Sequence, residues 1–283
     1  MLTSNPIADV PAYISPMAMQ IYVIVMAILV VGGVLLDVIH KQSAKYFFAN
    51  AKKAEAMRKR EVSSGEKMGL AVATVASEVL TSSEFCNPKR RLSHLLTMYG
   101  FIIFLVSTVA LVFAYPTGGA PTIWPALWHI GAISLAVGGY WFWFFIRVDV
   151  AAEGKKWYEV SLRGDLFIVS LLAMSTFGLI WSYLASSGAD SVGAMIFFWL
   201  FVVATTTLFS TVLWSKFAHM FFKPAAAFQK RVTKADGSRE NLPAKYDLSD
   251  PAVHEKFPDI PMYMGKNPPN MGLGIKREAP RHY

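Results

Sequence analysis

The histidines are the side chains of this protein best suited to do chemistry inside a membrane. They are His40, His94, His129, His219, His254 and His282. The first four lie in or beside long apolar segments, where an ionisable group is costly and is therefore a functional candidate by default. The last two lie in a polar carboxyl-terminal tail, and we expect them to be ordinary solvated residues.

His94 and His219 form the pair that could ligate a haem. A six-coordinate b-type haem takes two neutral imidazoles from opposite sides of the iron, and two antiparallel helices can supply them without covalent attachment. Arg90 and Arg91 lie one turn before His94, and Lys216 lies three residues before His219, so these cations are placed to bind haem propionates. We therefore predict one haem b, with both histidines on its iron and no catalytic residue. The alternative treats both histidines as interfacial residues and the cations as topology signals alone.

His129 and His40 are the remaining candidates. His129 follows Trp124 and Trp128, which are typical of a membrane interface. It could bind a quinone carbonyl or ligate a second haem, but we favour an ordinary interfacial histidine because no other histidine lies at its depth. His40 closes an apolar segment beside Asp37, where it could help bind quinone, take a proton, or interact with the helix dipole alone.

The composition indicates that lipid is the main solvent of the chain. Charged residues make up only 16% of it, against about 25% in soluble domains. A spanning helix needs about 20 mostly apolar residues, and five stretches qualify. They run from about Met17 to Ile39, His94 to Ala114, Trp124 to Ile146, Leu166 to Leu184 and Val192 to Phe222. We predict an all-α integral membrane protein, a five-helix transmembrane bundle whose first helix is retained, since no basic residue precedes it as in a signal peptide.

The basic residues indicate how these helices are oriented. All 27 Lys and Arg residues fall within segments 41–91, 147–163 and 216–281. The positive-inside rule then places the amino terminus outside and the carboxyl tail in the cytoplasm, as in a multi-pass protein of the inner (cytoplasmic) membrane. Because topology explains the basic charge, nucleic-acid binding is not needed to account for it.

The chain is expected to comprise four parts. They are an outer segment and first transmembrane helix (1–40), a basic cytoplasmic loop (41–91), a four-helix transmembrane haem-binding bundle (92–222) and a cytoplasmic tail (223–283). The loop could contain an amphipathic helix near 45–61 and a second short helix near 66–80, and a plain solvated connector is the alternative. The tail has too little hydrophobic periodicity for a core of its own, yet it carries anchors such as Tyr246, Phe257 and Tyr263. We predict that the tail and loop dock on a cytoplasmic partner; simple disorder is the alternative.

Three segments together resemble a known family. They are residues 90–101 around His94, residues 128–131 around His129, and residues 214–224 around His219. Over about residues 86–224 the chain resembles the membrane cytochrome b subunits of the respiratory nitrate reductase gamma and heterodisulfide reductase type. The resemblance implies a five-helix protein that passes electrons between quinone and a cytoplasmic flavin/iron–sulfur oxidoreductase. The small size, the single histidine pair and the long basic tail are most similar to the membrane anchors of adenylylsulfate reductase.

One departure from that family limits the expected cofactors. Nitrate reductase type subunits carry two histidine pairs for two haems, whereas one complete pair is visible here, so a second haem is not expected. The single cysteine, Cys86, excludes a self-contained iron–sulfur cluster. We expect an electron-transfer subunit of a quinone-linked oxidoreductase complex rather than its catalytic subunit. The alternative is a haem-free membrane anchor that recruits a soluble complex; a transporter fits poorly because the helices lack central charges.

Overall fold

Five helices of this computed structural model are long and apolar enough to cross a membrane. They are α1 (Pro16–His40), α4 (Pro88–Ala114), α5 (Ile123–Trp141), α6 (Leu162–Ser187) and α7 (Ser191–Ser210). The structure describes residues 2–40, 43–85, 87–150, 152–188, 191–240, 242, 246–247 and 250–259, and within these ranges every regular element is a helix. The predicted all-α, five-helix transmembrane bundle is confirmed, and the chain is a multi-pass membrane protein.

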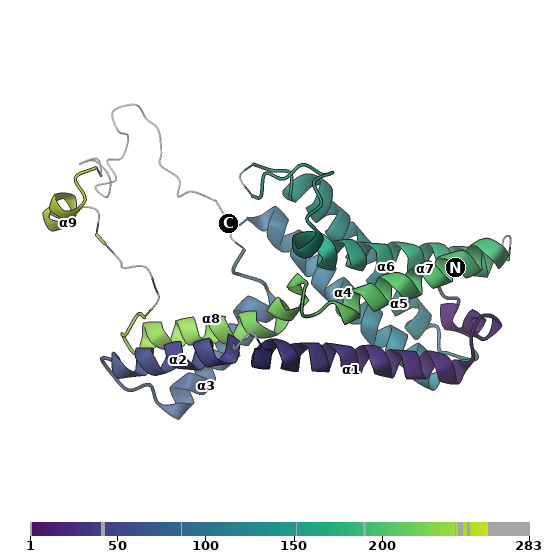
Figure 1. Cartoon of the computed structure of the whole chain (residues 1–283), viewed down its shortest axis with the longest axis horizontal. Coiled ribbons are helices and arrows are strands. Elements are labelled where there is room, and N and C mark those ends of the chain that lie inside the picture. Colours follow the sequence, from purple (N-terminus) through teal and green to yellow (C-terminus); the bar gives the residue numbers. More distant parts are fainter. Residues whose placement is uncertain are drawn as a thin grey trace.

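The amino-terminal segment closes one end of the bundle (Figure 1). Its 3-10 helix η1 (Pro6–Ala12) buries Ile7 and Val10 in the hydrophobic core. Just before η1, the side-chain amide of Asn5 donates to the carbonyl oxygen of Tyr115 at 3.2 Å, which ties the segment to the end of α4. These contacts make the amino-terminal segment part of the folded bundle.

Glycines allow α4 and α5 to pack backbone against backbone. A Cβ placed on Gly100 would lie 2.5 Å from the Leu135 nitrogen, and one on Gly131 would lie 2.5 Å from the Phe104 nitrogen. Farther along the same contact, the Ser93 hydroxyl of α4 donates to the carbonyl oxygen of Gly138 on α5 at 2.8 Å. Small residues at such a contact let helices in lipid approach closely and gain dispersion energy. The α4–α5 seam is therefore closed along much of its length.

Aromatic rings fill the centre of the bundle. Trp128 of α5 packs against Phe104 of α4, with ring centroids 4.8 Å apart, and against Trp181 of α6 at 6.3 Å. Trp181 in turn stacks on Phe201 of α7 at 5.7 Å. Both tryptophans are completely buried, so the middle of the bundle is a packed core shared by four helices.

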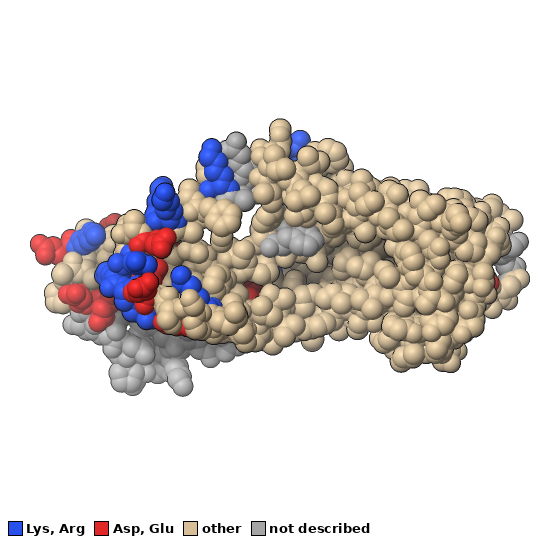
Figure 2. Space-filling view, turned by 90° about the horizontal axis from the view of Figure 1, so that it is seen from below, with Lys and Arg blue, Asp and Glu red and all other residues tan. Residues whose placement is uncertain are grey.

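A second helical unit extends from the end of the bundle opposite η1, and we call it the stalk. It comprises α2 (Ser43–Ala56), α3 (Ser64–Thr74), the π-helix η2 (Val75–Leu80) and α8 (His219–Ala235). Here α2 continues nearly in line with α1, and α8 lies beside α2 and α3 (Figure 1). Charged side chains gather on the stalk, whereas the same face of the bundle shows very few (Figure 2). This distribution is the one expected if the bundle lies in lipid and the stalk in water.

Polar contacts hold the stalk helices together. The Arg231 guanidinium on α8 lies 3.0 Å from the Glu78 carboxylate on η2. Just after this carboxyl-terminal end of α8, the backbone nitrogens of Lys59 and Arg60 donate to the Asp236 carbonyl at 2.9 and 3.1 Å. The predicted loop helices are confirmed in α2 and in α3 with η2. Farther along the tail, a short helix, α9 (Pro251–Lys256), is also present.

Two helix boundaries differ most from the sequence expectation. The helix predicted to start at His94 starts at Pro88, because the asparagine before it caps two backbone nitrogens. The predicted continuous fifth helix to Phe222 is wrong, because α7 ends at Ser210 and a turn precedes the 3-10 helix η4 (Lys216–Ala218) and α8. Threonine hydroxyls there, such as that of Thr211, donate to carbonyls four residues earlier, and such bonds favour bending of a helix.

Candidate functional site

His94 lies near the start of α4, where the bundle meets the stalk. Its ring is partly buried, and Nδ1 lies 3.0 Å from the Ser82 hydroxyl oxygen. Ser82 is completely buried and follows η2 in the loop 81–85. A buried hydroxyl beside one ring nitrogen restricts how the imidazole can turn.

Phe85 covers one side of this histidine, and their ring centroids are 4.9 Å apart. Two cations lie over the Phe85 ring, with Cζ of Arg90 at 5.5 Å and Nζ of Lys223 at 5.2 Å from its centroid. Arg90 also pairs with Glu153 at 3.3 Å. Lys223 pairs with Glu84 at 2.6 Å. The Phe85 ring therefore contacts residues of both α4 and α8, and Arg90 links this cluster to the connection between α5 and α6.

The other predicted cations have different surroundings. Nε of Arg91 donates to the Thr81 carbonyl at 2.6 Å, so this guanidinium holds the loop that carries Ser82. Lys216 is exposed at the start of η4. Of the three cations expected near a haem, the structure brings Arg90 into the cluster around Phe85, and it adds Lys223, which the sequence did not single out.

His219 is the first residue of α8, four residues before Lys223, and its side chain lies outside the described residues. The helix α8 packs against η2, which leads directly into the loop beside His94. The chain segments that carry the two histidines therefore converge at loop 81–85. The pairing of the two imidazoles on one iron stays a prediction.

The surroundings of His94 fit a haem ligand. A histidine that binds a metal usually gives its second ring N–H to another protein group, which fixes the tautomer. Ser82 is placed to be that group for Nδ1, so Nε2 would be the ligating atom. Arg90 and Lys223 supply positive charge in the same cluster. These are side-chain types that a b-type haem uses, and the haem itself, with His219 as its second ligand, stays a prediction.

His129 and His40 have contrasting surroundings. His129 is completely buried, with Nδ1 2.8 Å from the Pro125 carbonyl and Nε2 2.7 Å from the Ser182 hydroxyl. A carbonyl only accepts, so Nδ1 carries the proton and Nε2 accepts from the hydroxyl. A quinone or an iron at His129 would have to displace one of these bonds, and the geometry favours a structural histidine. His40 is exposed at the end of α1, whereas Asp37 is buried. Quinone binding or proton uptake at His40 stays a prediction from the sequence.

A buried ion pair at the stalk end of the bundle was not predicted. Nη2 of Arg147 lies 2.7 Å from the Asp165 carboxylate, and the two side chains are 0% and 5% exposed. Arg147 also donates to the carbonyls of Lys156 and Glu159, and its Cζ lies 4.1 Å from the centre of the Trp143 ring. These contacts fasten the connection between α5 and α6. Opposite charges at the adjoining ends of two consecutive spans were the signal that could have revealed the pair.

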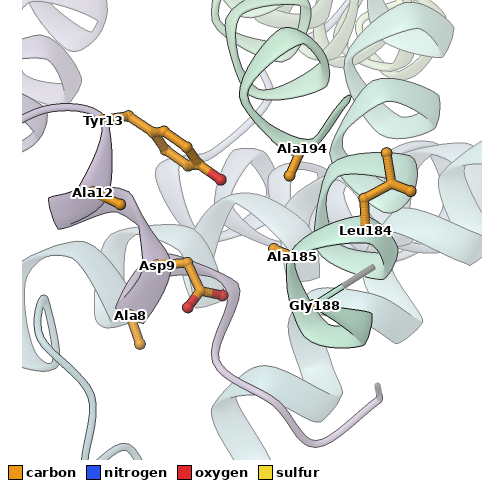
Figure 3. Close-up of a pocket in the computed structure, with 8 residues that line it drawn as sticks. All are labelled: Ala8, Asp9, Ala12, Tyr13, Leu184, Ala185, Gly188 and Ala194. Carbon is orange, nitrogen blue, oxygen red and sulfur yellow. The ribbon is translucent and has the colours of Figure 1, made fainter. Parts of the chain in front are cut away.

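A cavity of about 280 Å³ opens beside η1, at the end opposite the stalk. Alanines and a glycine form much of its wall, and the Asp9 carboxylate and Tyr13 hydroxyl turn toward the space between η1 and α6 (Figure 3). Burial raises the pKa of Asp9. A second cavity, of about 250 Å³, lies in the stalk between α2 and α8 and is lined in part by Phe47 and Lys230. Neither cavity is lined by the histidine of the cluster at loop 81–85.

Comparison with known proteins gives no relative from which to transfer a function. No family model, curated protein or solved structure matches the chain. The function must therefore be argued from the residues of the site and their chemistry.

Proposed function

We propose that this protein is a membrane b-type cytochrome subunit that passes electrons between the quinone pool and a cytoplasmic flavin/iron–sulfur oxidoreductase. The observation that carries the proposal is the cluster at loop 81–85. There a partly buried membrane-helix histidine is held by a buried hydroxyl, next to two cations and to the start of α8, which carries a second histidine. By resemblance, the partner would be of the adenylylsulfate reductase type.

The haem, when bound, would supply one-electron chemistry, and the protein would supply its binding and its electrostatic surroundings. His94 and His219 would hold the iron. Arg90 and Lys223 would offset the propionate charge, which requires their pairs with Glu153 and Glu84 to loosen or to be shared. Phe85 covers part of the site with apolar surface and so restricts the access of water to His94.

The stalk is the surface on which we propose that the soluble oxidoreductase docks. It extends beyond the bundle and carries charged side chains (Figures 1 and 2). It also exposes apolar residues along α3 and η2. These apolar residues are Met68, Val72, Val75 and Leu80. Tyr246 and Phe257 of the tail pack on each other with ring centroids 5.1 Å apart, and the tail from 260 onward lies outside the described residues. Docking there would bring the partner near His94.

The decisive experiment compares the oxidised and dithionite-reduced absorbance spectra of the purified protein. The proposal expects a low-spin b-type spectrum that is lost in His94→Ala and in His219→Ala. His129→Ala and His254→Ala are matched controls and should retain it, because the first is bonded within the bundle and the second lies in the tail. Wild-type protein without haem, even after reconstitution, would refute the cytochrome and leave the haem-free anchor. Loss of the spectrum in His129→Ala alone would show that the wrong histidines have been paired.

Docking is tested by truncating the tail without disturbing the stalk. Because Arg231 and Asp236 belong to the contacts that hold the stalk together, the cut is best placed after Leu242. The truncated protein should keep its haem spectrum but lose membrane retention of the soluble oxidoreductase and its quinone-linked turnover. Full retention and turnover would show that the tail takes no part in docking.

A further inference from the structure

Ser82 has a backbone conformation that glycine would adopt more easily. Its φ is 47°, in the left-handed region, and its side chain is completely buried. A residue with a Cβ pays a conformational cost there that glycine avoids. What serine offers in exchange is a hydroxyl group, and its oxygen lies 3.0 Å from Nδ1 of His94. The cost of this φ is therefore explained if the Ser82 hydroxyl has a function as a hydrogen-bond partner of the His94 ring.

The loop that carries this hydroxyl is fixed to the helix that carries the ring. The Tyr99 hydroxyl on α4 donates to the Leu80 carbonyl at 2.7 Å, just before the loop. The Arg91 guanidinium, also on α4, donates to the Thr81 carbonyl at 2.6 Å. Because both anchors belong to α4, the position of the Ser82 oxygen is set relative to His94 rather than to the stalk alone.

We propose that Ser82 is a positioning residue for His94: its hydroxyl oxygen accepts a hydrogen bond from Nδ1–H, fixes the ring orientation and leaves Nε2 as the atom that would bind haem iron. This inference rests on the proposed function. A hydroxyl can accept from Nδ1–H, and the opposite tautomer would instead place the proton on the nitrogen needed by the metal. Ser82 is thus expected to favour the tautomer and the ring orientation in which His94 binds iron.

The expected effects follow from the electronic role of such a partner. A hydrogen-bond acceptor at Nδ1 raises the basicity of the imidazole, and loss of such a partner typically weakens metal affinity by about 10- to 100-fold. Without the Ser82 hydroxyl, Nε2 becomes a weaker donor to ferric iron. Haem should then dissociate about 10-fold more readily or worse, and the midpoint potential should move to a higher value.

Ser82→Gly separates the hydroxyl from the backbone strain. Glycine accepts the left-handed φ, so this variant should fold, and helicity by circular dichroism with a single gel-filtration peak in detergent checks that it does. Ser82→Ala removes the hydroxyl but keeps the Cβ. Ser83→Ala is the matched control, because the neighbouring serine is exposed. Haem titration of the apoprotein, the midpoint potential and the g-values of the ferric haem are measured for each variant.

The inference expects Ser82→Gly and Ser82→Ala to share the weaker haem affinity, the higher potential and altered g-values, with Ser83→Ala like wild type. If Ser82→Gly is folded and matches wild type in all three, the positioning role is refuted while the cytochrome proposal stands. If only Ser82→Ala is affected, the hydroxyl serves to offset the cost of a Cβ at this φ rather than to tune the ring, and the inference is also refuted. If wild type itself binds no haem, the proposed function fails first.

Discussion

Substituting Gly131 by alanine should destabilise the bundle, and the structure indicates by how much. The added Cβ would lie 2.5 Å from the Phe104 nitrogen and 2.9 Å from the Gly100 carbonyl oxygen, where ordinary contact begins at 3.4 Å. Both obstacles are backbone atoms of α4, so neither can rotate away, and the helices must part by up to about 0.9 Å. Overpacking of this kind costs about 1–3 kcal/mol, and a gap of 0.5–1 Å forfeits roughly a quarter to a half of the dispersion energy of the atoms it separates.

Alanine also gains about 1 kcal/mol over glycine in helix propensity, so the control must isolate that gain. Gly32 of α1 provides it, since nothing lies within 4 Å of a Cβ built there. Unfolding in mixed micelles, followed by tryptophan fluorescence and circular dichroism, should show Gly32→Ala equal to or more stable than wild type. Gly131→Ala should be less stable by up to about 2 kcal/mol after the propensity gain is counted. If the two variants are equally stable, the close α4–α5 seam is refuted.

Three further predictions concern topology, the buried ion pair and pH. Reporter fusions after Gly119 and after Tyr283 should report opposite compartments, and a shared compartment would refute the five-span orientation. Asp165→Asn leaves the Arg147 guanidinium buried without its ion partner and should lower the free energy of unfolding by about 3–5 kcal/mol, whereas replacing both residues by apolar ones of similar volume should cost much less. Burial raises the pKa of Asp9, so the folded protein holds a proton on this carboxyl group more readily than the unfolded chain does. The stability that comes from this proton is fully present below the ordinary pKa of 3.8 and is lost as pH rises through the raised pKa. Asp9→Asn should therefore raise the melting temperature relative to wild type at pH 7 but not at pH 3, and a pH-independent difference would contradict this.

The spans could be predicted from hydropathy because the backbone of a segment in lipid has to form its own hydrogen bonds. A chain without water around it must satisfy its own N–H and C=O groups, so a long apolar run becomes a helix. The ends of the spans are set by other interactions. The asparagine cap begins α4 at Pro88, and threonine hydroxyls near Thr211 accompany the end of α7 at Ser210. Hydropathy does not register either effect, so the predicted fifth span ran too far.

The candidate site was only partly predictable, because its parts are far apart in the sequence. His94 and Arg90 stood out because they are ionisable groups at the edge of an apolar run. Phe85 and Ser82 lie in a connecting loop, where neither hydropathy nor spacing marks them. Lys223 reaches the site because α8 packs on η2. Its ion-pair partner there, Glu84, lies 139 residues earlier in the chain.

The closed α4–α5 seam restricts how any ligand could reach His94. Ser93, the residue before it, faces that seam and donates its hydroxyl to the Gly138 carbonyl at 2.8 Å, and Gly138 itself leaves no room for a Cβ against Thr97. A helix turns by about 100° per residue, so His94 points to a different side of α4 from Ser93, toward the loop that carries Ser82. A haem on His94 would therefore lie beside loop 81–85, at the junction between bundle and stalk. Under the proposed function, electrons would leave the membrane at the level where a partner on the stalk could receive them, and no second haem would be needed on that side.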